Sequence, residues 1–155
     1  MRNARSAGTI NVDKSVPQEV QCTLQGKIRM PDTARRKLLP AMFYRNAAGS
    51  EPVRKWLANL AREDRRIVGQ DIATVEFGWP VGMPLCRSLT SRRGLWEVRS
   101  AVTSGRIARV LFFTHRGQMV LLHGFIKKTQ RTPDDDLDLA MKRKAEVERD
   151  SKAQK

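Results

Sequence analysis

The stretch LWEVRSAVTSGRIARVLFFTHRGQMVLLHGFIKK, residues 95–128, contains three apolar runs joined by short glycine-containing connections. The expected strands are residues 95–101, 106–115 and 119–128, and a fourth strand at residues 86–89 precedes them. Connections of this length that contain glycine are typical of β-hairpins. Parallel strands would need a much longer crossover, so the pattern predicts an antiparallel meander of four strands.

Two helices are predicted before this meander. Four apolar residues recur at positions i, i+3, i+4 and i+7, which form one face of a helix: Val53, Trp56, Leu57 and Leu60. Ser50 is the expected N-cap of this helix, with Pro52 in its first turn. The same period continues through Ile72 and Val75 until Gly78 ends a second helix. The short link between the two helices predicts an antiparallel helical hairpin.

A short strand at residues 39–45 and a helix after residue 132 complete the predicted fold. Thr132 is the expected N-cap of this helix and Pro133 its first residue, followed by Asp134, Asp135 and Asp136 at the positive end of the helix dipole. The order β-α-α-β-β-β-β-α predicts an α+β fold. In this fold an N-terminal strand and a helical hairpin pack on a small antiparallel sheet, and a C-terminal helix follows.

This folded domain is expected to span residues 39–150. Residues 1–38 are polar, basic and aperiodic, which is typical of a flexible extension, either a nucleic-acid-binding arm or a dispensable tail. Residues 151–155 are expected to form a disordered tail. No apolar segment resembles a membrane span or a signal sequence, so a cytoplasmic protein with no membrane association is expected.

The chain of 155 residues carries a formal net charge of +14. Residues 87–131 hold ten basic residues and a single acid, Glu97. A strong positive charge favours a polyanionic partner, either nucleic acid or a membrane surface. There is no glycine-rich phosphate loop, no serine nucleophile elbow and no cysteine–histidine cluster, and Cys22 and Cys86 lack disulfide or metal-ligand spacing. We therefore expect neither a cofactor nor a metal.

Cations within apolar strands suggest a site that could cleave RNA. In such a reaction the ribose 2′-hydroxyl attacks its own phosphate, and the protein supplies proton transfer and cations for the developing charge. The candidate cations are Arg99, Arg109, Lys127 and Lys128, and the guanidinium groups among them match phosphate geometry. His115 and His123 are the only imidazoles that could move a proton, and Phe125 could stack on a base.

Each of these residues also has an ordinary structural interpretation. His123 fits a half-buried strand position, and Phe125 fits a core position. Glu97 and Arg99 can form a purely structural ion pair. The basic stretch can be a solvated face or a passive phosphate-binding patch. The residue pattern alone therefore predicts a basic α+β nucleic-acid-binding protein, with catalysis as an open alternative.

Three segments and the amphipathic helix that follows them resemble the RelE/ParE toxin superfamily. The segments are GLWEVRS (94–100), RIARVLFF (106–113) and VLLHGFIKKTQRTP (120–133). The resemblance is closest to the phage-derived HigB-type branch and covers roughly residues 40–149 in the same element order. It implies a type II toxin that enters the ribosomal A site, cleaves mRNA without a metal and so inhibits translation. It also implies a cognate helix-turn-helix antitoxin, with operator DNA bound only through the complex of the two proteins.

The resemblance also implies roles for particular residues. Carried over by position, Arg99, Arg109, Lys127 and Lys128 are the expected catalytic cations, with Arg87 and Arg131 in contact with RNA. Members of the superfamily differ in the residue that moves the proton. The only tyrosine here, Tyr44, lies in the first strand, away from the C-terminal site, so His123 or Glu97 would have to serve.

Two alternatives to the mRNA endonuclease stay open. The first is a ParE-like poison of DNA gyrase, although the FIKKTQRTP segment (125–133) favours the HigB-type interpretation. The second is a basic nucleic-acid-binding phage remnant without catalytic activity. Induced cleavage of mRNA, induced DNA damage and absence of toxicity would distinguish the three.

Overall fold

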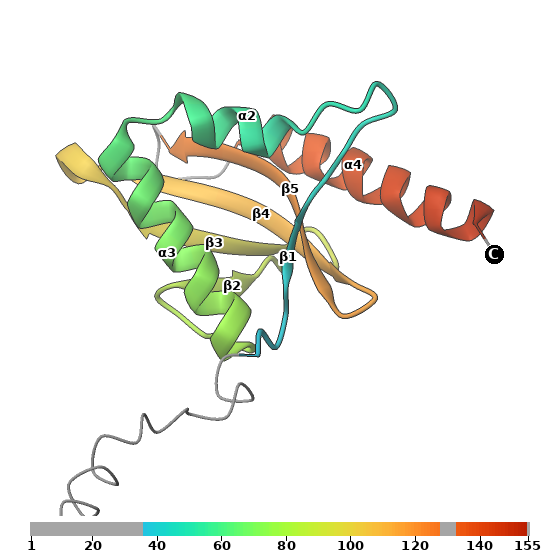
Figure 1. Cartoon of the computed structure of the whole chain (residues 1–155), viewed down its shortest axis with the longest axis horizontal. Helices are drawn as coiled ribbons and strands as arrows, with labels where there is room; N and C mark the ends of the chain where they lie inside the picture. The colour runs from blue at the N-terminus through green and yellow to red at the C-terminus, as the bar shows by residue number, and fades with distance from the viewer. Residues whose placement is uncertain (1–35, 128–132, 155) are drawn as a thin grey trace, which may run out of the picture. The chain divides into compact units, whose positions relative to one another are not determined.

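The computed structural model describes residues 36–127 and 133–154, which lie within one unit of the chain (Figure 1). Its elements in chain order are β1 (Ala41–Phe43), α2 (Pro52–Asn59), α3 (Arg62–Gly78), β2 (Cys86–Ser88), β3 (Trp96–Ala101), the 3-10 turn η2 (Thr103–Gly105), β4 (Ile107–His115), β5 (Gln118–Lys127) and α4 (Asp134–Ala153). Three residues named above, Lys128, Arg131 and Thr132, lie outside the described residues, as does most of the N-terminal extension.

The strands form one five-stranded sheet in the order β1-β5-β4-β3-β2. The predicted antiparallel meander is confirmed, because β2, β3, β4 and β5 pair with their sequence neighbours in antiparallel fashion. The pairing of the N-terminal strand was not predicted: β1 pairs with β5 in parallel, so the five-stranded sheet as a whole is mixed. The helical hairpin separates β1 from the meander, so no tight turn fixes the direction in which β1 joins the sheet.

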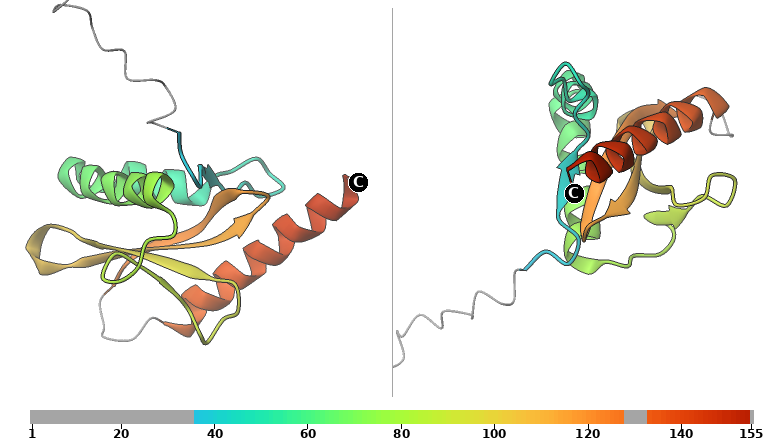
Figure 2. Two further views of the ribbon diagram at one scale, coloured as in Figure 1. Left: turned by 90° about the horizontal axis from the view of Figure 1, so that it is seen from below. Right: turned by 90° about the vertical axis from the view of Figure 1, so that its right-hand side faces the viewer.

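The sheet is covered on both faces. Figure 2 shows α2 and α3 on one face and α4 on the other. The core under α2 and α3 includes Val68, Val98 and Phe112, and the core under α4 includes Leu111 and Leu137. The predicted helical hairpin on one face of the sheet is therefore confirmed. On the opposite face α4 covers part of the sheet, and the ends of the strands extend past the helix.

One register shift in β5 changes which residues share a face. Leu111 pairs with His123, whereas the next residue of β4, Phe112, pairs with Leu121, so Leu122 is an extra residue in β5. Simple alternation along residues 119–127 would place Met119, Leu121, His123, Phe125 and Lys127 on one face of the sheet. The bulge instead turns the second half of β5 over. Met119 and Leu121 face α2 and α3, while Phe125 packs with the α4-side core.

Gly124 is required by a close approach of α2 to the sheet. A β-carbon on Gly124 would lie 2.3 Å from Cε3 of Trp56, the aromatic residue of the predicted helix face. Atoms cannot approach this closely without displacement of the ring or the strand. The HGFIKK segment therefore contains glycine because the indole of Trp56 lies directly on the backbone of β5.

The helix starts differ from the predictions by one residue. The N-cap of α2 is Glu51, and Ser50 instead closes a turn in which its N–H donates to Oδ1 of Asn46 at 2.9 Å. The N-cap of α4 is Pro133, whose extended ψ of 138° excludes it from the helix. The three aspartates do occupy the first turn, as predicted. At its other end α4 continues to Ala153, so residues 151–153, expected in a disordered tail, are helical.

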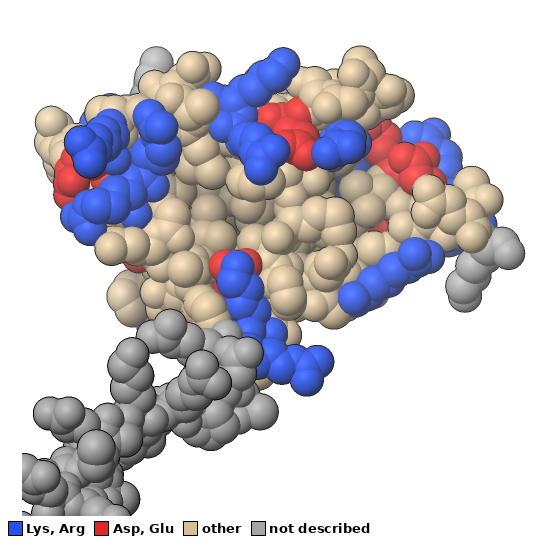
Figure 3. Space-filling view, viewed as in Figure 1, with Lys and Arg blue, Asp and Glu red and all other residues tan. Residues whose placement is uncertain are grey.

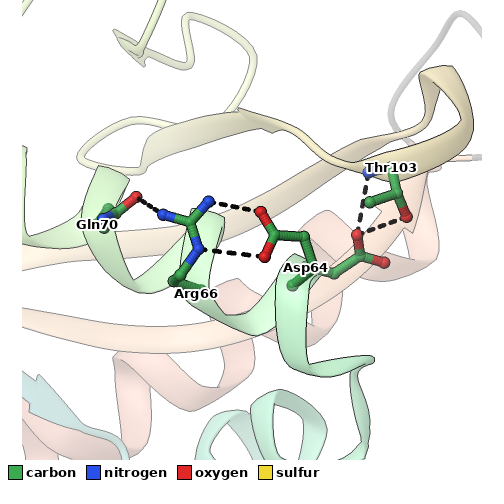
Figure 4. Close-up of polar contacts among 5 residues, drawn as sticks. Asp64, Arg66, Gln70 and Thr103 are labelled. Carbon is green, nitrogen blue, oxygen red and sulfur yellow. Dashed lines mark hydrogen bonds and ion pairs between the residues drawn. The ribbon is translucent and has the colours of Figure 1, made fainter.

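A buried carboxylate joins the start of α3 to the β3–β4 connection. Asp64 is 1% exposed, and Oδ1 accepts hydrogen bonds from the Thr103 backbone N–H at 3.0 Å and from its hydroxyl at 2.7 Å (Figure 4). Arg106 donates to Oδ2 at 2.6 Å. The hydrogen bonds from Thr103, with the nearby charge of Arg106, hold the pKa of Asp64 below its usual value.

Replacement of Gly124 by alanine is expected to destabilise the fold by about 1–3 kcal/mol, the usual cost of overpacking a core. The free energy of unfolding is measured by urea denaturation. Gly69→Ala in α3 is the matched control, because nothing lies within 4 Å of a β-carbon there. Alanine in that helix interior should stabilise by about 0.5–1 kcal/mol. Equal effects of the two substitutions would contradict the contact between Trp56 and β5.

Replacement of Asp64 by asparagine is expected to destabilise the protein in a pH-dependent way. A lowered folded pKa contributes stability that is fully present above the unfolded value of about 3.9 and is lost as the pH falls through the folded pKa. The difference between wild type and Asp64→Asn, measured by urea denaturation, should therefore be largest near neutral pH and shrink below about pH 4. A difference independent of pH would show that the charge of Asp64 is not involved.

Candidate functional site

The meander brings seven of the predicted site residues onto the α4-side face of the sheet: Arg87, Glu97, Arg99, Arg109, His123, Phe125 and Lys127. In the strand registers Arg87 lies opposite Glu97, Arg99 lies opposite Arg109, and Arg109 lies opposite Phe125. Because side chains alternate along a strand, Glu97 and Arg99 share a face, and the pairing carries the same face to β2, β4 and β5. Residues from four strands are thus neighbours although they span forty positions of sequence.

Glu97 is the centre of this group. Its side chain is fully buried, and each carboxylate oxygen has an arginine partner. Nε of Arg87 donates to Oε1 at 2.8 Å, and Arg109, itself 2% exposed, donates from a terminal nitrogen to Oε2 at 2.5 Å. Arg99 approaches Oε1 through Nε at 3.9 Å, beyond hydrogen-bond distance. The expected pair of Glu97 and Arg99 is therefore present as the longest of three ionic contacts.

Lys127 extends the group at the end of β5. Burial lowers the pKa of Lys127, and the charges of Arg109, Arg99 and Arg87 lower it further, whereas Glu97 acts in the opposite direction. We call these five residues, Arg87, Glu97, Arg99, Arg109 and Lys127, the cation cluster. Four cations and one carboxylate give the cluster a formal net charge of +3.

The cation cluster has the properties of an anion site. Like charges directly opposite each other in a sheet repel, as Arg99 and Arg109 do here, and a single carboxylate offsets only part of that repulsion. Arg99 is 26% exposed, and among the described residues its guanidinium has only the distant contact with Glu97. A phosphate bound beside Arg99 and Lys127 would offset part of the remaining charge and accept their hydrogen bonds.

The cations on the opposite face of the molecule are arranged differently. Figure 3 shows the face formed by α2 and α3, where Lys and Arg gather over the ends of the helices and the middle is uncharged. Arg45 and Arg54 both pair with Glu51 there, and Arg66 pairs with Glu63 in an exposed ion pair. Exposed pairs of this kind are ordinary surface features that contribute little free energy. The cation cluster differs from them because its carboxylate is fully buried.

His123 lies next to the cluster, and both of its ring nitrogens face α4. Nε2 is 2.8 Å from Oδ1 of Asp136, and Nδ1 is 3.4 Å from a terminal nitrogen of Arg143. An arginine can only donate, so these partners assign the proton of a neutral ring to Nε2. The ring stacks on Phe125 with centroids 5.5 Å apart. His123 therefore joins β5 to α4, and no ring nitrogen is directed at the cation cluster in this arrangement.

One other candidate, His115, lies away from the cluster. His115 is at the opposite end of β4, six residues or about 20 Å along the strand from Arg109, and its Nε2 contacts the Ser151 hydroxyl at 2.9 Å. Lys128 and Arg131 lie outside the described residues. Among residues 36–127 and 133–154, no three His, Cys, Asp or Glu side chains are grouped so as to hold a metal ion, and no helix is long and apolar enough to cross a membrane.

The sequence did not indicate Arg143 as a residue near the site, and it suggested that Tyr44 lies away from it. Arg143 donates to the Leu122 carbonyl at 2.7 Å, and its guanidinium lies 5.5 Å from the ring centroid of Tyr44. Arg143 therefore contacts both Tyr44 and His123, which come close because β1 lies beside β5. The hydroxyl of Tyr44 donates to Glu146, and burial, with this hydrogen bond, raises the pKa of Tyr44 to about 12. With this pKa the phenol of Tyr44 stays protonated near neutral pH.

The order and layering of these elements are those of a RelE-like α+β fold, and the α4-side face carries the cation cluster. Residues 55–145 match the family described as phage derived protein Gp49-like. This match covers more than half of the chain, and the chain belongs to the phage-derived Gp49-like family. A search of curated proteins found no match. The predicted phage-derived origin is confirmed at the level of this family.

The single tyrosine of the chain permits a direct test of the contact between β1 and α4. We expect tyrosinate absorbance to appear with a midpoint near pH 12 rather than 10. Because the unfolded chain ionises first, stability should fall as the pH rises above about 10. Tyr44→Phe should remove this loss and cost about 1 kcal/mol near neutral pH, measured by urea denaturation. A midpoint near pH 10 would contradict the buried hydrogen bond to Glu146.

Proposed function

We propose that this protein is the toxin of a type II toxin–antitoxin system and cleaves mRNA on the ribosome. The observation that carries the proposal is the cation cluster, in which four cations surround one buried carboxylate on the side of the sheet opposite the α2–α3 hairpin. Membership of a phage-derived family of RelE/HigB type supports it. The proposed outcome in the cell is inhibition of translation.

The cluster fits the requirements of RNA cleavage by the ribose 2′-hydroxyl. Attack of this oxygen on the adjacent phosphorus builds negative charge on the phosphorane, and cleavage releases the 5′ oxygen of the next nucleotide and leaves a cyclic phosphate. Arg99 and Arg109 would stabilise the developing charge, because guanidinium groups match phosphate oxygens. Phe125 lies opposite Arg109 in the sheet and would support a base of the bound RNA.

In the proposed arrangement Lys127 transfers the proton: its neutral amine takes the proton of the attacking 2′-hydroxyl, and the ammonium so formed gives it to the leaving 5′ oxygen. The lowered pKa of Lys127 increases the fraction of neutral amine that can accept a proton, and its half-buried position leaves it accessible. His123 could take this role only after its contacts with Asp136 and Arg143 open. Glu97 is unsuited to it, since arginines engage both of its oxygens.

The proposed partners are the ribosome with its mRNA and a cognate antitoxin. A net charge of +14 favours association with ribosomal RNA through long-range attraction. The antitoxin is proposed to carry a helix-turn-helix domain, so that operator DNA is bound only by the complex. The proposed location is the cytoplasm, where translation takes place.

The proposal is tested by induced expression followed by primer extension on cellular mRNA. Wild-type protein should stop growth and produce cuts within translated codons. Arg99→Gln and Lys127→Gln should each reduce cleavage of mRNA on purified ribosomes by about 100- to 1,000-fold, the usual effect of losing one transition-state donor. Lys55→Gln, which removes an exposed cation on α2, is the matched control and should cleave normally.

The other outcomes identify the alternatives. DNA damage without mRNA cleavage would support a gyrase poison and contradict the endonuclease. Growth without toxicity, together with salt-sensitive RNA binding, would identify a non-catalytic binding protein. Equal loss of cleavage in Lys55→Gln and Lys127→Gln would show that total charge, and not the cation cluster, determines activity.

A further inference from the structure

We propose that Glu97 is a positioning residue, whose buried carboxylate holds Arg87, with the buried Arg109 behind it, as a rigid fork from which the exposed Arg87 contacts one phosphate of an RNA strand. This inference rests on the proposed function for its ligand, RNA, but it concerns binding rather than cleavage. The sequence suggested Glu97 as a residue that transfers a proton, whereas the role proposed here is to hold arginine side chains in place.

Burial makes Glu97 an unusual choice for stability alone. A buried carboxylate loses its hydration, and its attraction to partner arginines often does no more than offset that cost. Apolar residues of similar size frequently fill such positions at equal or better stability. Glu97 is nevertheless the single acid among residues 87–131, and three of their arginines, Arg87, Arg99 and Arg109, make ionic contacts with it.

The contacts of Glu97 leave Arg87 able to bind a ligand while its position is fixed. Glu97 engages Arg87 through Nε, so the terminal nitrogens of this arginine, whose side chain is 40% exposed, are free to point outward. Long cationic side chains normally lose considerable rotational freedom when they bind an anion. Because Glu97 orders the Arg87 side chain when the protein folds, this conformational entropy is not lost again when a phosphate binds.

Glu97 also allows like charges to remain close before RNA binds. Arg99 and Arg109 lie opposite each other, and Lys127 is near enough for both to lower its pKa. Without a carboxylate these groups would separate toward solvent. With it they stay together and retain an excess of positive charge, so the empty site keeps the arrangement that a phosphate requires.

This role and a passive cation patch predict effects of opposite sign. Glu97 is an anion, so Coulomb repulsion opposes the approach of a phosphate to it. If the patch acts only through its total charge, Glu97→Gln should strengthen RNA binding and steepen its salt dependence. If Glu97 orders the fork, the same substitution should weaken binding although it makes the protein more positive.

The experiment measures binding of a short 2′-O-methyl RNA, which cannot be cleaved because the attacking hydroxyl is blocked. Glu97→Gln is expected to bind about tenfold more weakly than wild type at fixed salt. Glu63→Gln is the matched control, since it adds the same unit of charge at an exposed carboxylate on α3. It should bind as wild type or slightly more tightly. Binding by Glu97→Gln that equals or exceeds that of wild type would overturn the proposal.

A second variant keeps the test decisive if Glu97→Gln does not fold. Arg87→Lys preserves charge at an exposed position but removes the Nε that Glu97 holds. We expect about tenfold weaker binding, and unchanged affinity would contradict the proposal. Glu97→Asp, which retains the charge, should recover part of the affinity. Weakened binding in these variants, together with wild-type protein that never cleaves mRNA, would leave the role of Glu97 intact and reject only the endonuclease.

Discussion

The pairing of β4 with β5, including the extra residue Leu122, is the constraint on which the site depends. Without this bulge, alternation would place His123, Phe125 and Lys127 under the α2–α3 hairpin with Leu121. The bulge instead turns them to the side that carries Glu97. Gly124 then faces the hairpin, and its missing side chain allows Trp56 to lie directly on β5. One irregularity of backbone pairing thus serves both the core and the site.

Burial and charge are balanced differently on the two faces of the sheet. Beneath α2 and α3 the core is apolar, and the buried carboxylate of Asp64 at its edge is satisfied by Thr103 and Arg106. On the other face Glu97 is satisfied as well, yet the cations around it exceed its charge. In the first arrangement the negative charge of Asp64 is matched by the positive charge of Arg106. The second leaves an excess that an anionic ligand can neutralise.

The sequence predicted features that depend on neighbours along the chain and missed those that depend on distant contacts. Strands and helices followed from periodicity and turn glycines. The parallel direction of β1 did not, because no hairpin links it to β5. The cations of the site were found because charged residues stand out in apolar strands, but the burial of Glu97 depends on its pairing with Arg87 and Arg109. The contact of His123 with Asp136 depends on where α4 packs, which no local pattern specifies.

The packing of α4 also limits which groups can take part in chemistry. Asp136 and Arg143 of this helix occupy the two nitrogens of His123, and Arg143 continues the contacts to Tyr44. Proton transfer by His123 would therefore require its contacts with Asp136 and Arg143 to open. Lys127 needs no such movement, since it is half-buried at the strand end and its environment already lowers its pKa. In this geometry α4 and His123 support the sheet through their mutual contacts, and the proposed RNA-binding residues lie at the strand ends outside these contacts.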